Sequence, residues 1–376
     1  MYKSDGTTTT SVLKNLPQWL TKRHVLFALA LATSLLLLFS FNSWGPEVHL
    51  PHVNTGTADA QKSSSSNSDN GVLRPQCAGR DKVASLNLWD ESQSKYTGLM
   101  DDKFTYVSPR PPSLTSPLTD IAPFCSIAIQ TYRRPDELNQ TLHLLTDSVI
   151  PSLHEIVIVW NDLESTPPPN FVSAHGVGVR YRVSRRNSLN EKLFPDPEYK
   201  TKAILLSDDD VHYPPADLDF VFQTWRKYGR HRLTGAFARC VDTPRGPGSY
   251  QYSLCREKGR SEYALVLTGL AFAHIEVLDY FSSTDPLMTR LRTAIDEHFN
   301  CEDIALNFVS SMLSCEGPLE VHGMGLPVNT EPKSGISRKP GHAKLRNDCL
   351  RDFSDWFGYM PLQNTTERIV QGILAI

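Results

Sequence analysis

The chain has 376 residues, of which 40% are hydrophobic and 21% are charged, and its formal net charge is −3. This length allows one large domain or two modest ones with appendages. The charge balance excludes the strongly basic class of nucleic-acid-binding proteins. The composition is uneven along the chain and separates a polar start, an apolar run and a longer mixed region.

The first 24 residues are polar and include basic side chains at positions 3, 14, 22 and 23. An uncharged run of 17 residues follows from Val25 to Phe41. That is the lower limit for a membrane-spanning helix, and it suits a thin early-secretory membrane. Basic residues before a span keep that side in the cytoplasm. We therefore expect a cytoplasmic tail over 1–24, a single-pass type II signal anchor over 25–41, and a luminal chain beyond it in the Golgi or endoplasmic reticulum.

Two other interpretations of the apolar run are a cleaved signal peptide and a buried core helix. The long polar leader and the lack of a clean small-residue cleavage pattern disfavour the first, and the polar flanks disfavour the second. All seven cysteines follow the run, and so do the glycosylation sequons at Asn139 and Asn364. This distribution is expected of a glycoprotein in an oxidising lumen. The odd count leaves at least one thiol free or paired with another chain.

Residues 42–122 predict a flexible luminal stem. They contain a serine tract over 63–66 and a proline-rich stretch over 109–117. Such a segment cannot bury enough apolar surface to offset the entropy of ordering it. The sequence changes at about residue 123, and we expect one folded domain over 123–370.

That domain begins with alternating strands and helices. Apolar runs predict strands over 124–129, 155–160, 177–183 and 202–207. Pro135 opens a helix between the first two strands, and a second helix ends at Gly229. Their inward residues at helical spacing are Leu138, Leu142, Leu145 and Val149 in the first helix and Leu218, Phe222 and Trp225 in the second. Strand–helix alternation of this kind predicts an α/β fold with a mixed, mostly parallel sheet flanked by helices.

Two further elements follow. The runs 233–241 and 249–254 flank a turn rich in Pro and Gly and predict a hairpin, and Cys240 and Cys255 on its two arms are placed to form a disulfide. Asn300 is expected to cap a helix that turns Ile304, Phe308 and Met312 inward.

Asp208, Asp209 and Asp210 follow the apolar strand over 202–207 directly. In an open α/β sheet, ligands bind outside the carboxyl ends of the strands. Adjacent carboxylates repel one another unless a cation offsets their charge, and hard oxygen ligands suit Mn²⁺ or Mg²⁺. The triplet therefore predicts a metal site. A solvated acidic turn that caps the next helix is the alternative.

Polar groups also follow the three earlier strands. A crevice that binds a nucleotide diphosphate needs cations for the phosphates and amides for the base and ribose, and arginine reaches phosphate with a planar fork. Loops are commonly polar, so only the set as a whole points to a nucleotide site. Its members are Gln130, Thr131, Tyr132, Arg133 and Arg134 after the first strand, Asn161 and Asp162 after the second, and Arg185, Arg186, Asn187, Asn190 and Lys192 after the third.

Glu302 and Asp303 form a second acidic constellation, at the start of the helix that follows Asn300. One interpretation is that both only complement the positive end of the helix dipole. The other is that one of them faces the crevice and acts on a sugar or on an acceptor hydroxyl. The local pattern does not choose between them.

The region from about 124 to 361 resembles the exostosin family of sugar transferases, glycosyltransferase family 64. The resemblance rests on seven stretches that occur in the family's order over some two thirds of the chain. They are IQTYRR (129–134), VIVWN (157–161), NSLN (187–190), AILLSDDD (203–210), LTG (267–269), CEDIALNF (301–308) and WFGYMP (356–361).

The resemblance implies a GT-A type fold and a metal-dependent, retaining transfer of a sugar from a UDP-sugar donor. The donor sugar would be an N-acetylhexosamine, the cofactor Mn²⁺ or Mg²⁺, and the acceptor a glycan or a glycolipid. The resemblance leaves open whether the chain forms an oligomer with itself or with other glycosyltransferases. The alternative function is a catalytically silent luminal partner of another glycosyltransferase. A magnesium-dependent hydrolase lacks a nucleophile motif, and an inverting transferase remains a further rival.

Carried over residue by residue, the resemblance implies roles for particular side chains. Asp208 and Asp210 match metal ligands, Asp303 with Glu302 beside it matches the catalytic carboxylate, and Cys301 with Cys349 matches a family disulfide. Lys192 stands where the family usually has arginine, which weakens a bidentate contact. The positions that match the donor site are Gln130, Thr131, Arg134, Asn161, Asn190, Lys192, Asp208, Asp209, Arg239 and Arg346. Acceptor contacts are expected from 245–262 and 331–344, but the residues of these segments do not identify a particular glycan.

Overall fold

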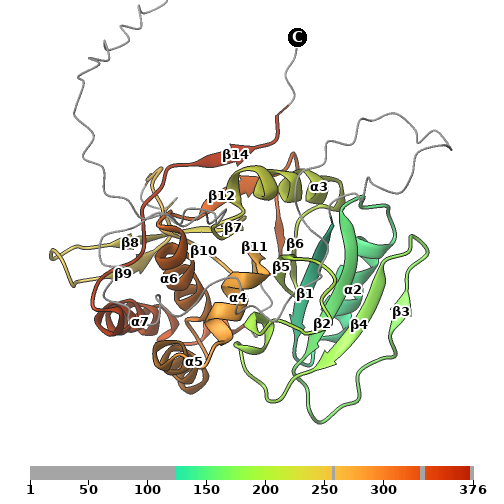
Figure 1. Ribbon diagram of the computed structural model, residues 1–376, viewed down its shortest axis with the longest axis horizontal. Helices are drawn as coiled ribbons and strands as arrows, with labels where there is room; N and C mark the ends of the chain where they lie inside the picture. The colour runs from blue at the N-terminus through green and yellow to red at the C-terminus, as the bar shows by residue number, and fades with distance from the viewer. Residues whose placement is uncertain (1–123, 256–258, 331–334, 373–376) are drawn as a thin grey trace, which may run out of the picture. The chain divides into compact units, whose positions relative to one another are not determined.

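The computed structural model of the chain describes residues 124–255, 259–330 and 335–372 (Figure 1). The predicted tail, anchor and stem lie outside these ranges. Among the helices in the described ranges, none is long and apolar enough to cross a membrane.

The centre of the domain is a nine-stranded sheet with the order β14-β12-β7-β11-β5-β1-β2-β4-β3. Strands β3 and β11 run antiparallel to their neighbours, and the others pair in parallel. The mixed, mostly parallel α/β sheet is thus confirmed. The strands are β1 (Cys125–Thr131), β2 (Leu153–Trp160), β3 (Phe171–Val172), β4 (Gly178–Val183), β5 (Ala203–Asp208), β7 (Thr234–Gly235), β11 (Leu270–His274), β12 (Leu319–His322) and β14 (Arg368–Val370).

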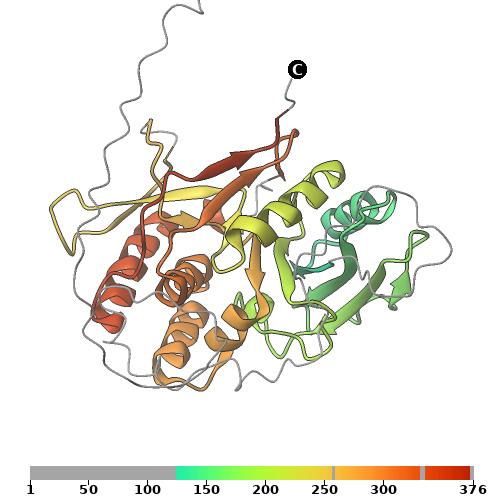
Figure 2. The same ribbon diagram turned by 45° about the horizontal axis from the view of Figure 1, so that its top comes forward.

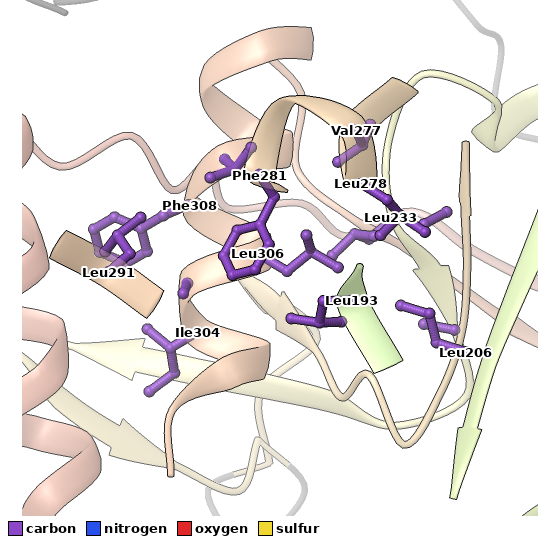
Figure 3. Close-up of a cluster of buried hydrophobic side chains, with 14 of the residues drawn as sticks. Leu193, Leu206, Leu233, Val277, Leu278, Phe281, Leu291, Ile304, Leu306 and Phe308 are labelled. Carbon is purple, nitrogen blue, oxygen red and sulfur yellow. The ribbon is translucent and has the colours of Figure 1, made fainter. Parts of the chain in front are cut away.

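Helices cover both faces of this sheet because successive strand residues point to opposite sides. Along β5, Ala203 and Leu205 join one buried cluster, whereas Ile204 and Leu206 join the other. The first cluster packs against α2 (Pro135–Thr146) and α3 (Pro215–Thr224), and the second against α4 (Ile275–Ser282), α5 (Pro286–His298), α6 (Glu302–Ser314) and α7 (His342–Phe357). Helices α4 to α7 gather in one group (Figure 2), and Figure 3 shows Leu206 within their cluster.

Smaller elements complete the domain. A three-stranded sheet contains β10 (Leu265–Val266), β8 (Ala238–Asp242) and β9 (Gln251–Ser253), and β6 (Val211–His212) pairs with β13 (Val328–Asn329). Short helical turns are η4 (Glu191–Leu193), η5 (Trp225–Gly229) and η7 (Ile336–Arg338).

Several sequence predictions need correction. The first helix ends at Thr146, so Val149 is outside it and 68% exposed instead of inward. The stretch 233–241 is not one strand: β7 belongs to the large sheet, whereas β8 forms the predicted hairpin with β9. Asn300 does not cap α6. The N-cap is Cys301, in the left-handed region, and the Asn300 side chain instead accepts a hydrogen bond from the Cys301 amide at 2.8 Å.

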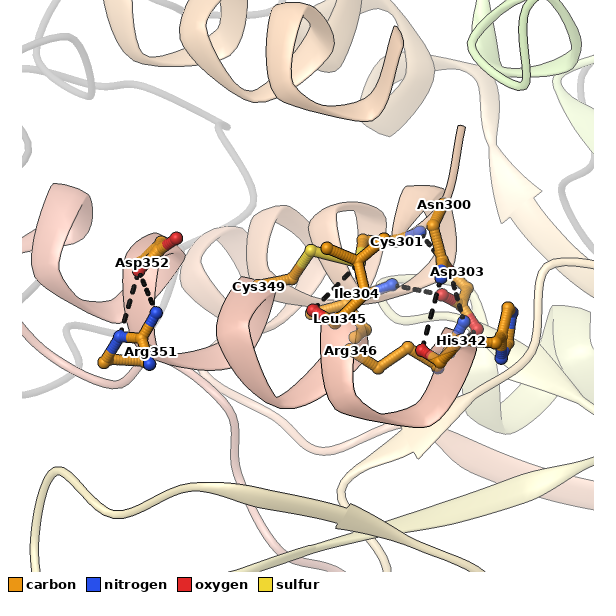
Figure 4. The surroundings of a disulfide bond; sticks show 10 residues. All are labelled: Asn300, Cys301, Asp303, Ile304, His342, Leu345, Arg346, Cys349, Arg351 and Asp352. Carbon is orange, nitrogen blue, oxygen red and sulfur yellow. Dashed lines mark hydrogen bonds and ion pairs between the residues drawn. A yellow bond between two sulfur atoms is a disulfide. The ribbon is translucent and has the colours of Figure 1, made fainter. Parts of the chain in front are cut away.

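Both predicted disulfides are present. Cys240 and Cys255 join the arms of the β8–β9 hairpin, and Cys301 and Cys349 join the start of α6 to α7. Cys125 is a buried free thiol, in agreement with the odd cysteine count. The second disulfide fastens the predicted catalytic segment to the C-terminal helix (Figure 4).

Candidate functional site

The polar residues that follow the first four predicted strands meet at one edge of the sheet. Strands β5, β1, β2 and β4 lie side by side in parallel, so their carboxyl ends share that edge. Gln130 is in register with Asp208, and Thr131 with Trp160. Gln130 and Thr131 are the last residues of β1 rather than loop residues, which fixes their backbone in the sheet. Distant parts of the chain are thereby brought together at one edge of the sheet.

Asp209 is the inward member of the acidic triplet. It is buried, and its carboxylate accepts hydrogen bonds from Thr131 at 2.7 Å and from Arg134 at 3.0 Å. Thr141 on α2 donates to its backbone carbonyl at 2.7 Å. Burial raises the pKa of Asp209 to about 7, against the lowering effects of Thr131 and Arg134. Asp209 therefore anchors the triplet to β1 and α2.

Asp208 and Asp210 face more open surroundings. Burial raises the pKa of Asp210, and the charge of Asp208 raises it further, while Arg134 at 2.9 Å lowers it. The Asp208 side chain is 41% exposed and accepts a hydrogen bond from Lys192. A Cβ on Gly269 would lie 2.8 Å from an Asp208 carboxylate oxygen, so only glycine leaves that carboxylate in place. Asp208 and Asp210 thus form a pair of carboxylates of which only Asp208 is exposed.

This pair fits a divalent cation by its chemistry. Across 124–255, 259–330 and 335–372, no three His, Cys, Asp or Glu side chains form a cluster that could hold a metal by itself. Magnesium-type sites, however, commonly use one or two carboxylates and complete their coordination with water and substrate phosphates. Two neighbouring carboxylates, of which Asp208 raises the pKa of Asp210, are suited to that arrangement. Asp208 and Asp210 would hold the ion.

The predicted amide residues form a cradle around one backbone carbonyl. The Gln130 and Asn161 side chains both donate to the carbonyl of Ser188, at 2.7 and 3.0 Å. Asn190 is fully buried, and its amide donates to the carbonyl of Arg292 and to Asp296. These side chains hold the loop between β4 and η4 against the tips of β1 and β2.

The second acidic constellation contains a buried ion pair. Asp303 is the second residue of α6 and accepts a hydrogen bond from Arg346 of α7 (Figure 4). Both side chains are nearly inaccessible to solvent. Arg346 also donates to Asn300 at 3.2 Å and lies over the ring of Tyr252. Although burial opposes its charge, Asp303 raises the pKa of Arg346 above its usual range. The Asp303 carboxylate is thus oriented by a fixed cation.

Lys192 joins the two constellations. It is buried in η4, where burial alone would lower its pKa, but Asp208, Glu302 and Asp303 together raise it. Burial raises the pKa of Glu302, and the neighbouring Asp303 adds to the effect, whereas Lys192 and Arg346 oppose it. Glu302 is only partly buried, in contrast to Asp303. Lys192 therefore pairs with Asp208 of the triplet, and the charges of Glu302 and Asp303 act on the same buried cation.

The remaining predicted positions are distributed around this centre. Burial raises the pKa of Tyr252, and the charges of Arg346 and of Arg239 on β8 oppose this, so Arg239 belongs to the second constellation. Arg185 and Arg186 instead pair with Glu191 and Asp296. The amide of Thr330 donates to the carbonyl of Asp210 at 3.2 Å, so the residue that precedes the predicted acceptor segment 331–344 lies at the triplet. Residues 256–258 and 331–334 of the acceptor segments lie outside the described residues.

Sequence reasoning missed three residues that support the site. Tyr252 underlies Arg346, Asn307 donates to the carbonyl of Asp303 at 2.7 Å, and Asp296 binds the loop after β4. Tyr252 and Asp296 are far along the chain from the residues they support, so no local pattern could have identified their roles. Asn307 is only four residues from Asp303, on the same helix.

Comparisons with known proteins agree with this geometry. A model of the glycosyl transferase family 64 domain matches residues 125–373. Glucosamine inositolphosphorylceramide transferase 1 of Arabidopsis thaliana is 34% identical over 227 residues, which are 58% of this chain and 28% of the plant protein. Exostosin-2 of Homo sapiens is 30% identical over 249 residues, or 64% of this chain and 33% of that protein. Exostosin-like 2 of Homo sapiens is 26% identical over 258 residues, or 65% of this chain and 76% of that protein.

The matched region is 28% of the plant protein and 33% of exostosin-2, but 76% of exostosin-like 2. The family model covers the whole region that contains the large sheet, the acidic triplet and the Asp303–Arg346 pair. The chain belongs to glycosyl transferase family 64.

Proposed function

We propose that the protein is a metal-dependent, retaining glycosyltransferase with a GT-A type domain, which transfers a sugar from a UDP-sugar to a glycan or a glycolipid. The observation that carries the proposal is the buried ion pair of Lys192 with Asp208, at a point where the charges of Glu302 and Asp303 also act on the lysine. A donor site and a sugar site must lie within the length of one nucleotide-sugar. The charge of Lys192 acts on residues of both acidic constellations, which supports their closeness to one another.

In this proposal the two halves of the crevice have different tasks. Asp208 and Asp210 hold a divalent cation, Mn²⁺ or Mg²⁺, while Arg134 and Lys192 add positive charge near the diphosphate. When bound, the cation neutralises the charge that develops on the leaving UDP. Gln130, Asn161 and the loop that they fasten would bind the nucleotide.

The bond between the anomeric carbon and the diphosphate oxygen breaks, and its electron pair leaves with UDP. Positive charge then develops on the sugar, and a fixed carboxylate stabilises it without reorganisation. Asp303, oriented by Arg346, and Glu302, partly exposed beside it, supply that negative charge. Retention would follow either from a covalent carboxylate intermediate or from attack by the acceptor on the same face as the leaving group.

The names of the relatives guide the choice of substrates. One relative is named glucosamine inositolphosphorylceramide transferase 1. That name favours an amino or N-acetylamino hexose as the donor sugar, and it supports a glycolipid as one class of acceptor. The apolar run 25–41 and the basic residues before it support a type II protein of the Golgi or endoplasmic reticulum.

The test incubates the purified full-length protein with a panel of UDP-sugars and Mn²⁺ and measures UDP release with and without glycan and glycolipid acceptors. We expect release with at least one donor, its loss with a chelator, and its loss in Asp210→Asn. Product stereochemistry then decides retention. Failure to bind UDP in the presence of Mn²⁺ would refute the proposal and favour a silent partner of another transferase.

A further inference from the structure

Asp296 lies in the last turn of α5 and binds three side chains of the loop between β4 and η4. Its carboxylate accepts hydrogen bonds from Ser188 and from Asn190, the latter at 3.0 Å, and it pairs with Arg186. Helix α5 is held elsewhere, since Met288, Leu291, Ala294 and Ile295 are buried in the cluster of α4 to α7. Asp296 is therefore a fixed point to which the loop is tied.

Helix energetics do not explain a carboxylate at this position. The carboxyl end of a helix carries partial negative charge, which disfavours aspartate in the last turn. The surrounding donors do explain it, because an ionised carboxylate accepts several hydrogen bonds at once. Asn190 is fully buried, so a donor left without its acceptor there would cost about 1–3 kcal/mol.

The tied loop contacts each part of the donor crevice. The carbonyl of Ser188 receives Gln130 from the end of β1 and Asn161 from the end of β2. Two residues after Asn190, Lys192 reaches Asp208. Displacement of this loop would move the amide cradle and the Lys192 cation together, although Asp296 itself belongs to α5, 106 residues beyond Asn190.

We propose that Asp296 is a positioning residue that holds the 184–190 loop, and through it Lys192, in the form that binds the nucleotide of the donor. The inference rests on the proposed function. A residue that fixes the binding loop acts equally in the ground state and in the transition state. Its loss should therefore raise KM for the donor and leave kcat nearly unchanged.

The experiment measures UDP binding to the full-length protein by titration calorimetry with Mn²⁺ present, together with KM and kcat for the active donor. Asp296→Ala should raise the UDP dissociation constant and KM at least about tenfold. Asp296→Asn keeps an acceptor oxygen for Ser188 and Asn190 and should restore most of the affinity. Glu297→Ala, which removes an exposed carboxylate from the next position of α5, should bind UDP like the wild type.

The possible results are separable. Wild-type protein that binds no UDP would overturn the proposed function and the role of Asp296 with it. If the wild type and Asp296→Ala bind UDP equally well, only the role of Asp296 is wrong. Equal losses in the Ala and Asn variants, with a matching fall in melting temperature and in kcat, would indicate a purely structural residue and would also overturn the inference.

Discussion

Arg346 of α7 donates a hydrogen bond to the Asp303 carboxylate at the start of α6, and its guanidinium lies 4.2 Å from the centroid of the Tyr252 ring. The disulfide between Cys301 and Cys349 joins the same two segments. Three interactions from different parts of the chain thus hold one carboxylate beside the crevice. Asp303 is consequently preorganised rather than free to reorient.

Asp303→Asn should lower kcat at least about 100-fold, because a neutral amide cannot stabilise the positive charge that develops on the sugar. The UDP dissociation constant should stay within a few-fold, since the donor residues are untouched. Asp352→Asn on the exposed side of α7 is the control for loss of one carboxylate. Near-normal turnover by Asp303→Asn with UDP still bound would show that the assigned role is wrong.

Arg346→Ala should lower the free energy of unfolding by about 3–5 kcal/mol, because it leaves the buried charge of Asp303 without its partner. Arg351→Ala removes a neighbouring arginine from α7 whose ion pairs are exposed, and it should cost at most about 1 kcal/mol. Urea unfolding of both variants measures the difference. Equal losses would mean that the Asp303 carboxylate gains solvent or another partner when Arg346 is removed.

Lys192→Ala should lower kcat/KM for the donor about 10 to 100-fold, because it removes the buried cation that pairs with Asp208. Lys192→Arg keeps the charge and should retain more activity than the alanine variant. Lys200→Ala removes an exposed lysine and serves as the control. Wild-type kinetics in Lys192→Ala would contradict a shared role for this cation.

Gly269→Ala should weaken Mn²⁺ binding about tenfold, since the added Cβ would lie 2.8 Å from an Asp208 oxygen and displace the carboxylate. In the matched variant Gly178→Ala, the new methyl group meets no atom within 4 Å. Calorimetric titration of the two proteins with Mn²⁺ compares them directly. Unchanged affinity in Gly269→Ala would argue that Asp208 does not bind the ion.

Glu320 on β12 offers a test by pH. Burial alone would raise its pKa, but the hydrogen bond from His322 at 2.9 Å and the pair with Arg368 of β14 lower it below the ordinary value of 4.5. A carboxylate with a depressed folded-state pKa contributes stability above its unfolded pKa, and this contribution is lost as the pH falls through the folded-state pKa.

Glu320→Gln should therefore melt at a lower temperature than the wild type near pH 7, and the difference should shrink below pH 4.5. Thermal melting across this range measures the effect. Glu367→Gln, whose exposed carboxylate pairs with Arg232, is the control and should change the melting temperature less. A difference that stays constant down to acid pH would refute the assignment to the ionised Glu320.

Much of the first half of the domain was predictable because its signals are local. The apolar runs of β1, β2, β4 and β5 alternate with an amphipathic helix and end in polar residues. A parallel sheet then necessarily brings those ends to one edge. The errors are also local in origin. Val149 continues the helical spacing beyond the end of α2 at Thr146, and the apolar run 233–241 contains both β7 of the nine-stranded sheet and β8 of the three-stranded sheet.

The sequence by itself determined the sheet class, the Cys240–Cys255 pair and the two acidic constellations as separate candidates, while the family resemblance implied the Cys301–Cys349 pair. Only the tertiary structure decided that Lys192 pairs with Asp208, that Asp209 is the anchor of the triplet, and that Asp296 ties the loop after β4. The reason is physical. Periodicity and strand ends are properties of neighbouring residues, whereas burial, charge pairing and hydrogen-bond partners depend on segments that meet only when the chain is folded.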